Sequence, residues 1–136
     1  MSTEKKIVQD FLSFISVGDT EGMINLLDED ATIITPGSPK VPFNGRFEGK
    51  KSILQAFKIF EEFLEIKDHT LKLIISENEH VFVIINETSR AANTNRFIKQ
   101  DTSWYFKIKS NKIFYWQVFE DTEQVSWAWN DSASRK

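Results

Sequence analysis

The spacing of hydrophobic residues changes half-way along the chain, and this change constrains the fold more than any other feature. In the first half, apolar residues recur three or four positions apart between Ile7 and Ile15, as on one face of a helix. The second half is a succession of β-rich runs with short breaks, at 69–77, 80–91, 96–109 and 112–121. Helices followed by closely linked strands predict an α+β fold, with helices packed on one face of a curved antiparallel sheet.

The first half contains the residues that begin and end helices. Ser2 or Thr3 can cap the first helix, and Gly18 can end it. The sequence then predicts a short helix after Asp19, a strand over 31–35, a proline-rich loop over 36–49 with a short strand at 41–43, and a helix over 50–66.

Composition narrows the functional class. The 136 residues fit one domain over 1–136, without a linker or an internal repeat. The net charge of −3 and the absence of any basic tract longer than a Lys pair disfavour a nucleic-acid partner. Neither a membrane-spanning run nor a signal peptide is recognised, so a soluble, cytoplasmic protein is expected. The 12 Phe, 4 Trp and 2 Tyr either build a core or line a cavity for an apolar ligand.

Motifs for metals and cofactors are missing. His69 and His80 form no ligand pair at helical spacing, and the chain has no cysteine. It has no Gly-x-Ser-x-Gly segment and no glycine-rich phosphate loop. We therefore expect no metal and no cofactor.

The order of several short motifs resembles a known family. Val8–Phe11, Gly18–Gly22 and Leu27–Thr32 resemble the opening of ketosteroid isomerase-like domains. Gly45–Ile53 is similar to the loop-to-helix segment of SnoaL-like proteins, and Lys112–Asp121 is similar to their last strand.

The resemblance covers about residues 5–125, leaving 126–136 as a C-terminal tail, and indicates the SnoaL-like branch of the nuclear transport factor 2-like superfamily. It implies a cystatin-like α+β barrel. In this fold a cone of curved antiparallel sheet wraps around N-terminal helices, a ligand cavity lies at the open end, and homodimers are common. The fold hosts enzymes and non-catalytic modules alike, so function has to be argued from individual residues.

The chain lacks the catalytic residues of two reactions that occur in the superfamily. Ketosteroid isomerases use an Asp base with a Tyr and a protonated Asp. The positions that match these three are Thr35, Phe11 and Trp104. Of these three, only Trp104 retains a suitable group, an indole N–H that can donate a hydrogen bond.

Limonene epoxide hydrolases need an Asp–Arg–Asp relay and residues that hold a water. The relay positions match Thr88, Arg90 and Val118, and the water-holding positions match Ile33 and Thr35. A relay cannot run through Thr and Val side chains, so this chemistry is not expected either.

Polyketide cyclases of the SnoaL type use an acid/base carboxylate inside the cavity, and Glu120 and Asp121 are the matching candidates. Strand alternation places Glu120 on the same face as Trp116 and Val118, whereas a bulge would present Asp121 instead. Both carboxylates are therefore catalytic candidates, and a solvated strand end is the alternative.

The same alternation along the strand over 80–91 predicts Thr88 and Arg90 near the cavity. Arg90 would anchor an acidic or carbonyl-bearing ligand, or else lie exposed near the following turn. The expected pocket comprises Phe11, Thr35, Phe57, Phe60, Thr88, Arg90, Trp104, Trp116 and Val118. Trp127 and Trp129 would cover the cavity mouth, or pack at the surface against a dimer partner.

Two functional classes follow from these residues. The first is a cofactor-free acid/base isomerase, cyclase or dehydratase that acts on a small apolar, carbonyl or carboxylate compound. The second is a non-catalytic dimeric module that binds a ligand or a partner.

Overall fold

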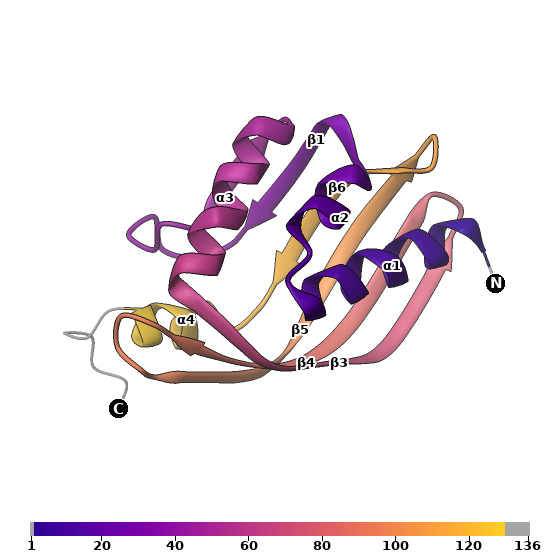
Figure 1. The fold of residues 1–136 in the computed structure, drawn as a ribbon. Helices are drawn as coiled ribbons and strands as arrows, with labels where there is room; N and C mark the ends of the chain where they lie inside the picture. The colour runs from indigo at the N-terminus through magenta and orange to yellow at the C-terminus, as the bar shows by residue number, and fades with distance from the viewer. Residues whose placement is uncertain (1, 130–136) are drawn as a thin grey trace.

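Three helices lie on one side of a curved six-stranded sheet (Figure 1). The computed structural model describes residues 2–129. Its elements are α1 (Thr3–Val17), α2 (Thr20–Asn25), β1 (Leu27–Thr35), β2 (Gly45–Glu48), α3 (Lys50–Phe63), β3 (Leu64–Glu77), β4 (His80–Ala91), β5 (Phe97–Lys109), β6 (Lys112–Phe119) and α4 (Thr122–Trp129). The predicted α+β class is confirmed.

The strands are ordered β2-β1-β6-β5-β4-β3, and the sheet is open rather than closed into a barrel. Four neighbouring pairs are antiparallel, as predicted, but β1 and β6 run parallel. The antiparallel prediction came from tight links between consecutive strands. Because β1 and β6 are joined through most of the chain, no tight turn fixes their relative direction.

Capping residues set the ends of the first two helices. The Ser2 hydroxyl accepts a hydrogen bond from the Lys5 N–H at 3.1 Å, so Ser2 is the N-cap of α1. Gly18 ends α1 in the left-handed conformation, with φ of 71°, and Asp19 caps α2 by accepting from the Gly22 N–H. None of the helices within 2–129 is both long and apolar enough to cross a membrane.

Several boundaries differ from the sequence prediction, and β1 and β3 begin earlier than predicted, at Leu27 and Leu64. Residues 41–43 form turns instead of a strand, and the strand that pairs with β1 is β2 at 45–48. The burial of Val41 and Phe43 explains their apolar character, because both pack in a hydrophobic cluster with Val125. The helix predicted to reach residue 66 ends at Phe63, where Leu64 turns to extended geometry and begins β3.

The C-terminal helix α4 was not predicted. Trp129 meets Phe63 edge-on, with ring centroids 4.6 Å apart, and the Arg96 guanidinium lies 4.8 Å from the Trp127 ring. Both tryptophans therefore pack against other parts of their own chain. Of the predicted tail, 130–136 lies outside the described residues.

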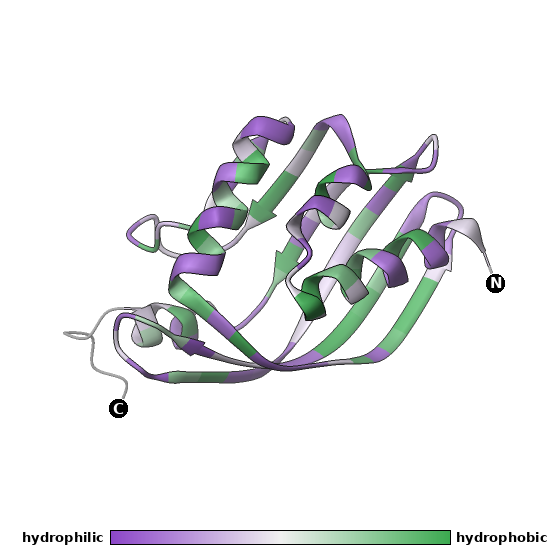
Figure 2. Ribbon diagram, viewed as in Figure 1, coloured by the Kyte–Doolittle hydropathy of each residue, from purple (hydrophilic) through white to green (hydrophobic). Residues whose placement is uncertain are grey.

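Aromatic rings dominate the main core between the helices and the sheet. Phe11 is fully buried and meets Phe106 and Trp116 edge-on, at centroid distances of 5.8 and 5.2 Å. Phe106 and Trp116 are stacked on adjacent strands, 5.8 Å apart. Along α1, α3 and the strands, hydrophobic residues recur between hydrophilic ones (Figure 2), as expected for elements with one buried face.

We expect Phe11→Ala to lower the free energy of unfolding by about 3–5 kcal/mol, because it removes a ring from a closely packed site. Denaturant unfolding followed by tryptophan fluorescence measures the change. Val17→Ala on the same helix is the matched control, since Val17 is 77% exposed and its truncation should change stability by less than about 0.5 kcal/mol. Equal losses in the two variants would contradict this account of the core.

Candidate functional site

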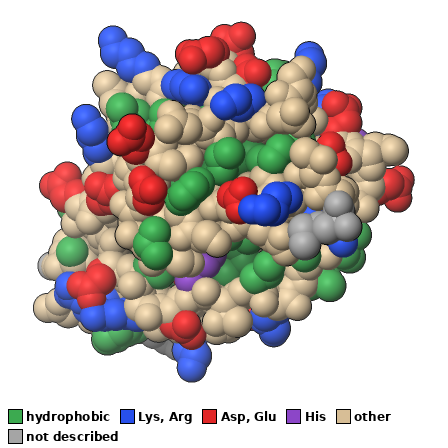
Figure 3. Space-filling view, turned by 45° about the vertical axis from the view of Figure 1, so that its right-hand side comes forward, with side chains coloured by type: hydrophobic (Ala, Val, Ile, Leu, Met, Phe, Trp, Pro, Cys, Tyr) green, Lys and Arg blue, Asp and Glu red, His purple; other side chains and the backbone are tan. Residues whose placement is uncertain are grey.

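A cavity of about 340 Å³ lies between the helices and the inner face of the sheet. Its lining comes from α1, α2, α3, α4 and five of the strands. Ser16, Gly18, Glu61 and Ile66 are the exposed residues of the lining, and they mark where the cavity reaches the surface. In space-filling view, hydrophobic side chains emerge on one face of the molecule between charged ones (Figure 3). The volume suits a small organic molecule.

The structure brings seven of the predicted site residues together around this cavity. They come from β1, α3, β5, β6 and the segment that follows β6, and they are Thr35, Phe57, Phe60, Trp104, Trp116, Val118 and Glu120. Strands distant in the sequence meet here because β1 pairs with β6, and β6 pairs with β5.

Phe11, Thr88 and Arg90 lie outside the lining. Phe11 is fully buried among core aromatics behind the cavity wall. On β4 it is Glu87 and Ser89 that line the cavity, so Thr88 and Arg90 fall on the opposite face of the strand.

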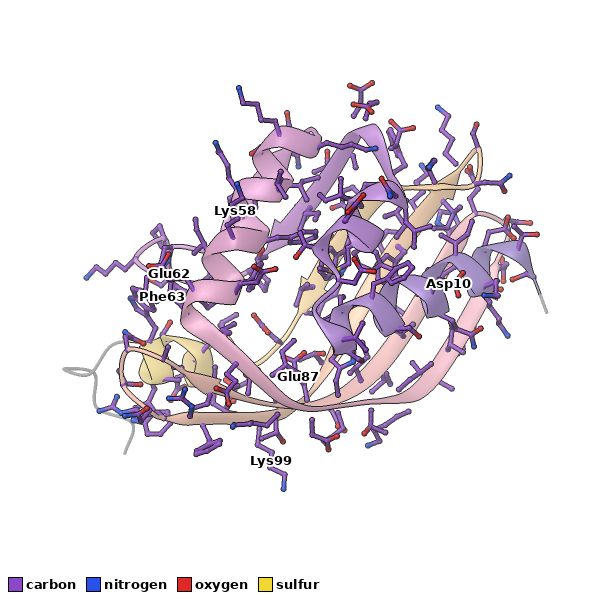
Figure 4. All side chains as sticks on the ribbon, viewed as in Figure 1. Asp10, Lys58, Glu62, Phe63, Glu87 and Lys99 are labelled. Carbon is purple, nitrogen blue, oxygen red and sulfur yellow. The ribbon has the colours of Figure 1, made fainter. Side chains whose placement is uncertain are left out.

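The contacts of Arg90 and Thr88 agree with an outward position. The Arg90 Nη2 lies 3.2 Å from the Glu65 Oε2, and its Nη1 donates to the Asn95 side chain. Thr88 is paired with Lys99, which projects away from the helices in Figure 4. Arg90 is thus partnered on the outer face, and it does not supply the cavity with a cation.

Glu120 and Asp121 have different positions. Glu120 lines the cavity, whereas the exposed Asp121 acts at the start of α4, where its Oδ1 accepts from the Gln124 N–H at 3.1 Å. Glu120 shares a face with Trp116 and Val118, so alternation continues past the end of β6 without a bulge at this point.

Glu87 is a site residue that the sequence reasoning missed. In Figure 4 it projects from the sheet toward the space between α1 and α3. A signal was present, because Val81, Val83 and Ile85 are buried and continue in steps of two to Glu87. The intervening Phe82 and Ile84 are also apolar, so the buried face of this strand could not be told from hydrophobicity alone.

Burial changes the acidity of both glutamates. It raises the pKa of Glu87 to about 7. It also raises the pKa of Glu120 to about 8, with smaller contributions from the negative charges of Glu87 and Asp121. Both carboxyl groups therefore have pKa values in the neutral range, and the charge of Glu87 helps to make Glu120 the weaker acid.

His69 lies behind Glu87. Its Nε2 is 3.6 Å from the Glu87 Oε2, and the imidazole is almost fully buried next to Trp104. Burial lowers the pKa of His69, an effect only partly opposed by the charge of Asp68. Burial therefore favours the neutral form of the imidazole. A neutral imidazole carries no positive charge that would lower the pKa of Glu87.

Several buried polar groups at the cavity have no hydrogen-bond partner within residues 2–129. They are the Thr35 hydroxyl, the indole N–H groups of Trp104 and Trp116, and the Gln100 side-chain amide nitrogen. Thr35, Trp104 and Trp116 are only 5%, 6% and 5% exposed. A buried donor without a partner is costly, which marks these groups as positions for a polar ligand atom.

The residues of the cavity suit proton transfer. No cluster of three or more metal-binding side chains occurs in the part of the chain that the structure describes. Two carboxyl groups with pKa values near neutrality, beside hydrogen-bond donors in an apolar cavity, can move a proton and stabilise a negatively charged oxygen.

No protein-family model matches the sequence, and no curated protein is similar to it. Solved structures do match. An NTF2-like protein from Burkholderia xenovorans is 25% identical, with a TM-score of 0.83 over 94% of this chain and 96% of that one. The chain has the NTF2-like fold.

Two further structural neighbours carry the names that the sequence motifs suggested. A candidate SnoaL-like polyketide cyclase from Mesorhizobium loti is 15% identical, with a TM-score of 0.70 over 88% of this chain and 99% of that one. A protein with a ketosteroid isomerase-like fold from Catenulispora acidiphila, solved in complex with trimethylamine, is 11% identical, with a TM-score of 0.77 over 95% and 97%. The predicted resemblance is confirmed at the level of the fold.

The buried glutamates make stability depend on pH. A carboxyl group whose pKa is raised by folding favours the folded state below its ordinary pKa, and this contribution is lost as pH rises toward the folded value. We therefore expect the free energy of unfolding to fall from about pH 5 to about pH 8. Each group should contribute a slope on the order of 1 kcal/mol per pH unit between its two pKa values.

Denaturant unfolding at several pH values measures this slope. Glu120→Gln should flatten it and raise stability at pH 8, because the variant has no charge to bury. The exposed Glu62, on α3 (Figure 4), provides the control Glu62→Gln, which should keep the wild-type slope. An unchanged slope in Glu120→Gln would contradict the burial of this carboxyl group.

Proposed function

We propose that this NTF2-like chain binds a small, mainly apolar carbonyl compound and transfers a proton on it without a cofactor, as an isomerase, cyclase or dehydratase does. The observation that carries the proposal is the pair of glutamates that face one apolar cavity, Glu87 and Glu120, beside donors without partners. Buried carboxyl groups in a cavity of ligand size are typical of acid/base sites.

The proposed reaction begins with Glu120 in its carboxylate form. Its oxygen takes a proton from the carbon next to the substrate carbonyl, the electron pair of the C–H bond forms a C=C bond, and the π electrons of the carbonyl group move to its oxygen. The resulting enolate oxygen accepts a hydrogen bond from the Trp104 indole N–H. Glu120 then returns the proton to another carbon, or to a departing hydroxyl group, which leaves Glu120 ready for the next turnover.

Glu87 is the second acid/base candidate in this scheme. Its negative charge raises the pKa of Glu120, which helps to keep the pKa of that residue in the neutral range. Asp121 is not proposed as a catalyst, because its side chain caps α4. Thr35 is proposed as a polar contact for the ligand, and Phe57, Phe60, Trp116 and Val118 as its apolar surroundings.

The charges around the cavity favour a neutral or cationic ligand over a carboxylate. Glu61, Glu87 and Glu120 belong to the described lining, which contains no Lys, Arg or His. An anionic ligand would add a further negative charge to an apolar site. The carboxylate class expected from Arg90 is therefore not part of this proposal.

A non-catalytic, dimeric binding module is the second candidate, and the outer face of the sheet favours it. Leu73, Ile75, Phe82 and Phe119 are exposed there, and the register places Ile75 opposite Phe82 on the two strands next to one edge. A second copy of the chain would cover these side chains, since exposed apolar surface marks interaction sites.

Proton exchange in D₂O tests the catalytic proposal. Small cyclic and aryl ketones are first screened for an increase in Tm, because a selective ligand stabilises the folded state. A ketone that binds should then lose its α-protons to solvent deuterium at a rate above background, measured by ¹H NMR.

Glu120→Gln should reduce that rate at least about 100-fold, because it removes the base. Trp104→Phe should reduce it by about 10-fold or more, because it removes a donor to the enolate oxygen. Glu62→Gln should exchange at the wild-type rate. Ketones that bind without any exchange above background would reject catalysis and favour the binding module.

The dimer is tested separately by light scattering after gel filtration. We expect wild-type protein at twice the monomer mass, and Phe82→Asp at the monomer mass, because a charge is introduced into the covered surface. Val17→Asp places the same charge on an exposed position of α1 and should remain dimeric. A monomeric wild-type protein would reject this interface.

A further inference from the structure

The charged side chains of the cavity all have the same sign. Among the described residues, the lining contains three carboxyl groups, from Glu61 on α3, Glu87 on β4 and Glu120 after β6. The nearest imidazole, that of His69, is kept neutral by burial. Asp121 adds a further negative charge near Glu120. The electrostatic potential of the cavity therefore favours a positive charge.

The glutamates differ in their environment. Glu61 is exposed at the cavity mouth and accepts a hydrogen bond from the Thr20 hydroxyl. Glu87 and Glu120 are mostly buried, and this burial raises the pKa of both side chains. In the described structure no Lys or Arg lies within ion-pair distance of Glu87 or Glu120.

A second feature points to a ligand independently of the acids. Three polar side chains that line the same cavity, Thr35, Trp104 and Trp116, are more than nine-tenths buried and have no partner among residues 2–129. The two indoles can only donate, so they need an acceptor such as a carbonyl oxygen. The Thr35 hydroxyl can accept a hydrogen bond as well as donate one.

Aromatic rings surround these polar groups. Trp104 and Trp116 are adjacent, with ring centroids 4.8 Å apart, and Phe57 lies 6.3 Å from Trp116. Aromatic rings attract organic cations, and the attraction is strongest where water is excluded. Carboxylates and aromatic rings in one small cavity are together complementary to a protonated amine with an apolar body.

We propose that the ligand of this cavity carries a basic nitrogen as well as a carbonyl oxygen, and that its ammonium group is bound by Glu87 and Glu120. The inference rests on the proposed function and specifies its substrate class as small apolar amino ketones. The ammonium group offsets the buried negative charge, and the carbonyl oxygen satisfies the indole donors.

A pair of isosteric ketones tests the proposal. The probes are 4-(dimethylaminomethyl)acetophenone and 4-isobutylacetophenone, which differ by a protonated nitrogen in place of a CH group. Titration calorimetry at pH 7.5 should show the amine binding at least about tenfold more tightly, because charge-assisted hydrogen bonds exceed neutral contacts.

Proton release provides a second measurement. An ammonium ion next to Glu87 and Glu120 lowers their pKa values, so at pH 6.5–7.5 the amine should displace protons from the protein, whereas the isobutyl ketone should displace none. Calorimetry in two buffers of different ionisation enthalpy gives the number of protons released.

Variants assign the effect to the two glutamates. Glu87→Gln and Glu120→Gln should each reduce the preference for the amine several-fold, and the double variant should abolish it while the isobutyl ketone still binds. Glu62→Gln, on the exposed face of α3, should retain the full preference. Because the comparison of the two probes on wild-type protein needs no variant, it remains decisive even if a substitution prevents folding.

The outcomes separate this inference from the proposed function. Equal affinity for the two ketones would overturn the amine class and leave a carbonyl-binding site standing. A preference for the amine that persists in the double variant would also overturn the inference, because the charge would then be recognised elsewhere. If neither these probes nor the ketones of the wider screen bind, the proposed function fails together with it.

Discussion

The packing of α1 against the aromatic side chains of β5 and β6 supports the rest of the structure. Phe11 meets Phe106 and Trp116 edge-on, and these two rings are stacked on neighbouring strands. Because Trp116 also belongs to the cavity lining, one ring system is both the core and the wall of the site. The curvature of the sheet leaves room beyond this contact, where α1 and α3 do not fill the concave side.

The same packing explains why the pKa values of Glu87 and Glu120 are raised. Glu87 and Glu120 are placed on the buried face by the strand alternation that also buries Val81, Val83 and Trp116. Ionising them in this position costs free energy, and within the described residues no Lys or Arg forms an ion pair with either of them. Groups that reduce stability in this way are characteristic of sites shaped by binding or catalysis.

The sequence predicted the architecture well because the signals were periodic. Helical spacing in the first half and paired strands in the second gave the α+β class, and Trp116 and Val118 correctly indicated the inward position of Glu120. The inward face of β4 was assigned wrongly, which led to Arg90 instead of Glu87, because both faces of that strand are apolar. The parallel pairing of β1 with β6, which brings Thr35 to the cavity, depends on long-range contacts that local patterns do not encode.

The short junction between β6 and α4 links Glu120 to the part of the cavity wall that α4 forms. Glu120 and Asp121 alone separate the two elements, and Val125 of α4 also lines the cavity. A movement of α4 that admits water would hydrate Glu120 and bring its pKa back toward that of a solvated carboxyl group. Moving α4 away from the cavity would thus make Glu120 a stronger acid. Closing α4 over a bound molecule would make the Glu120 carboxylate a stronger base.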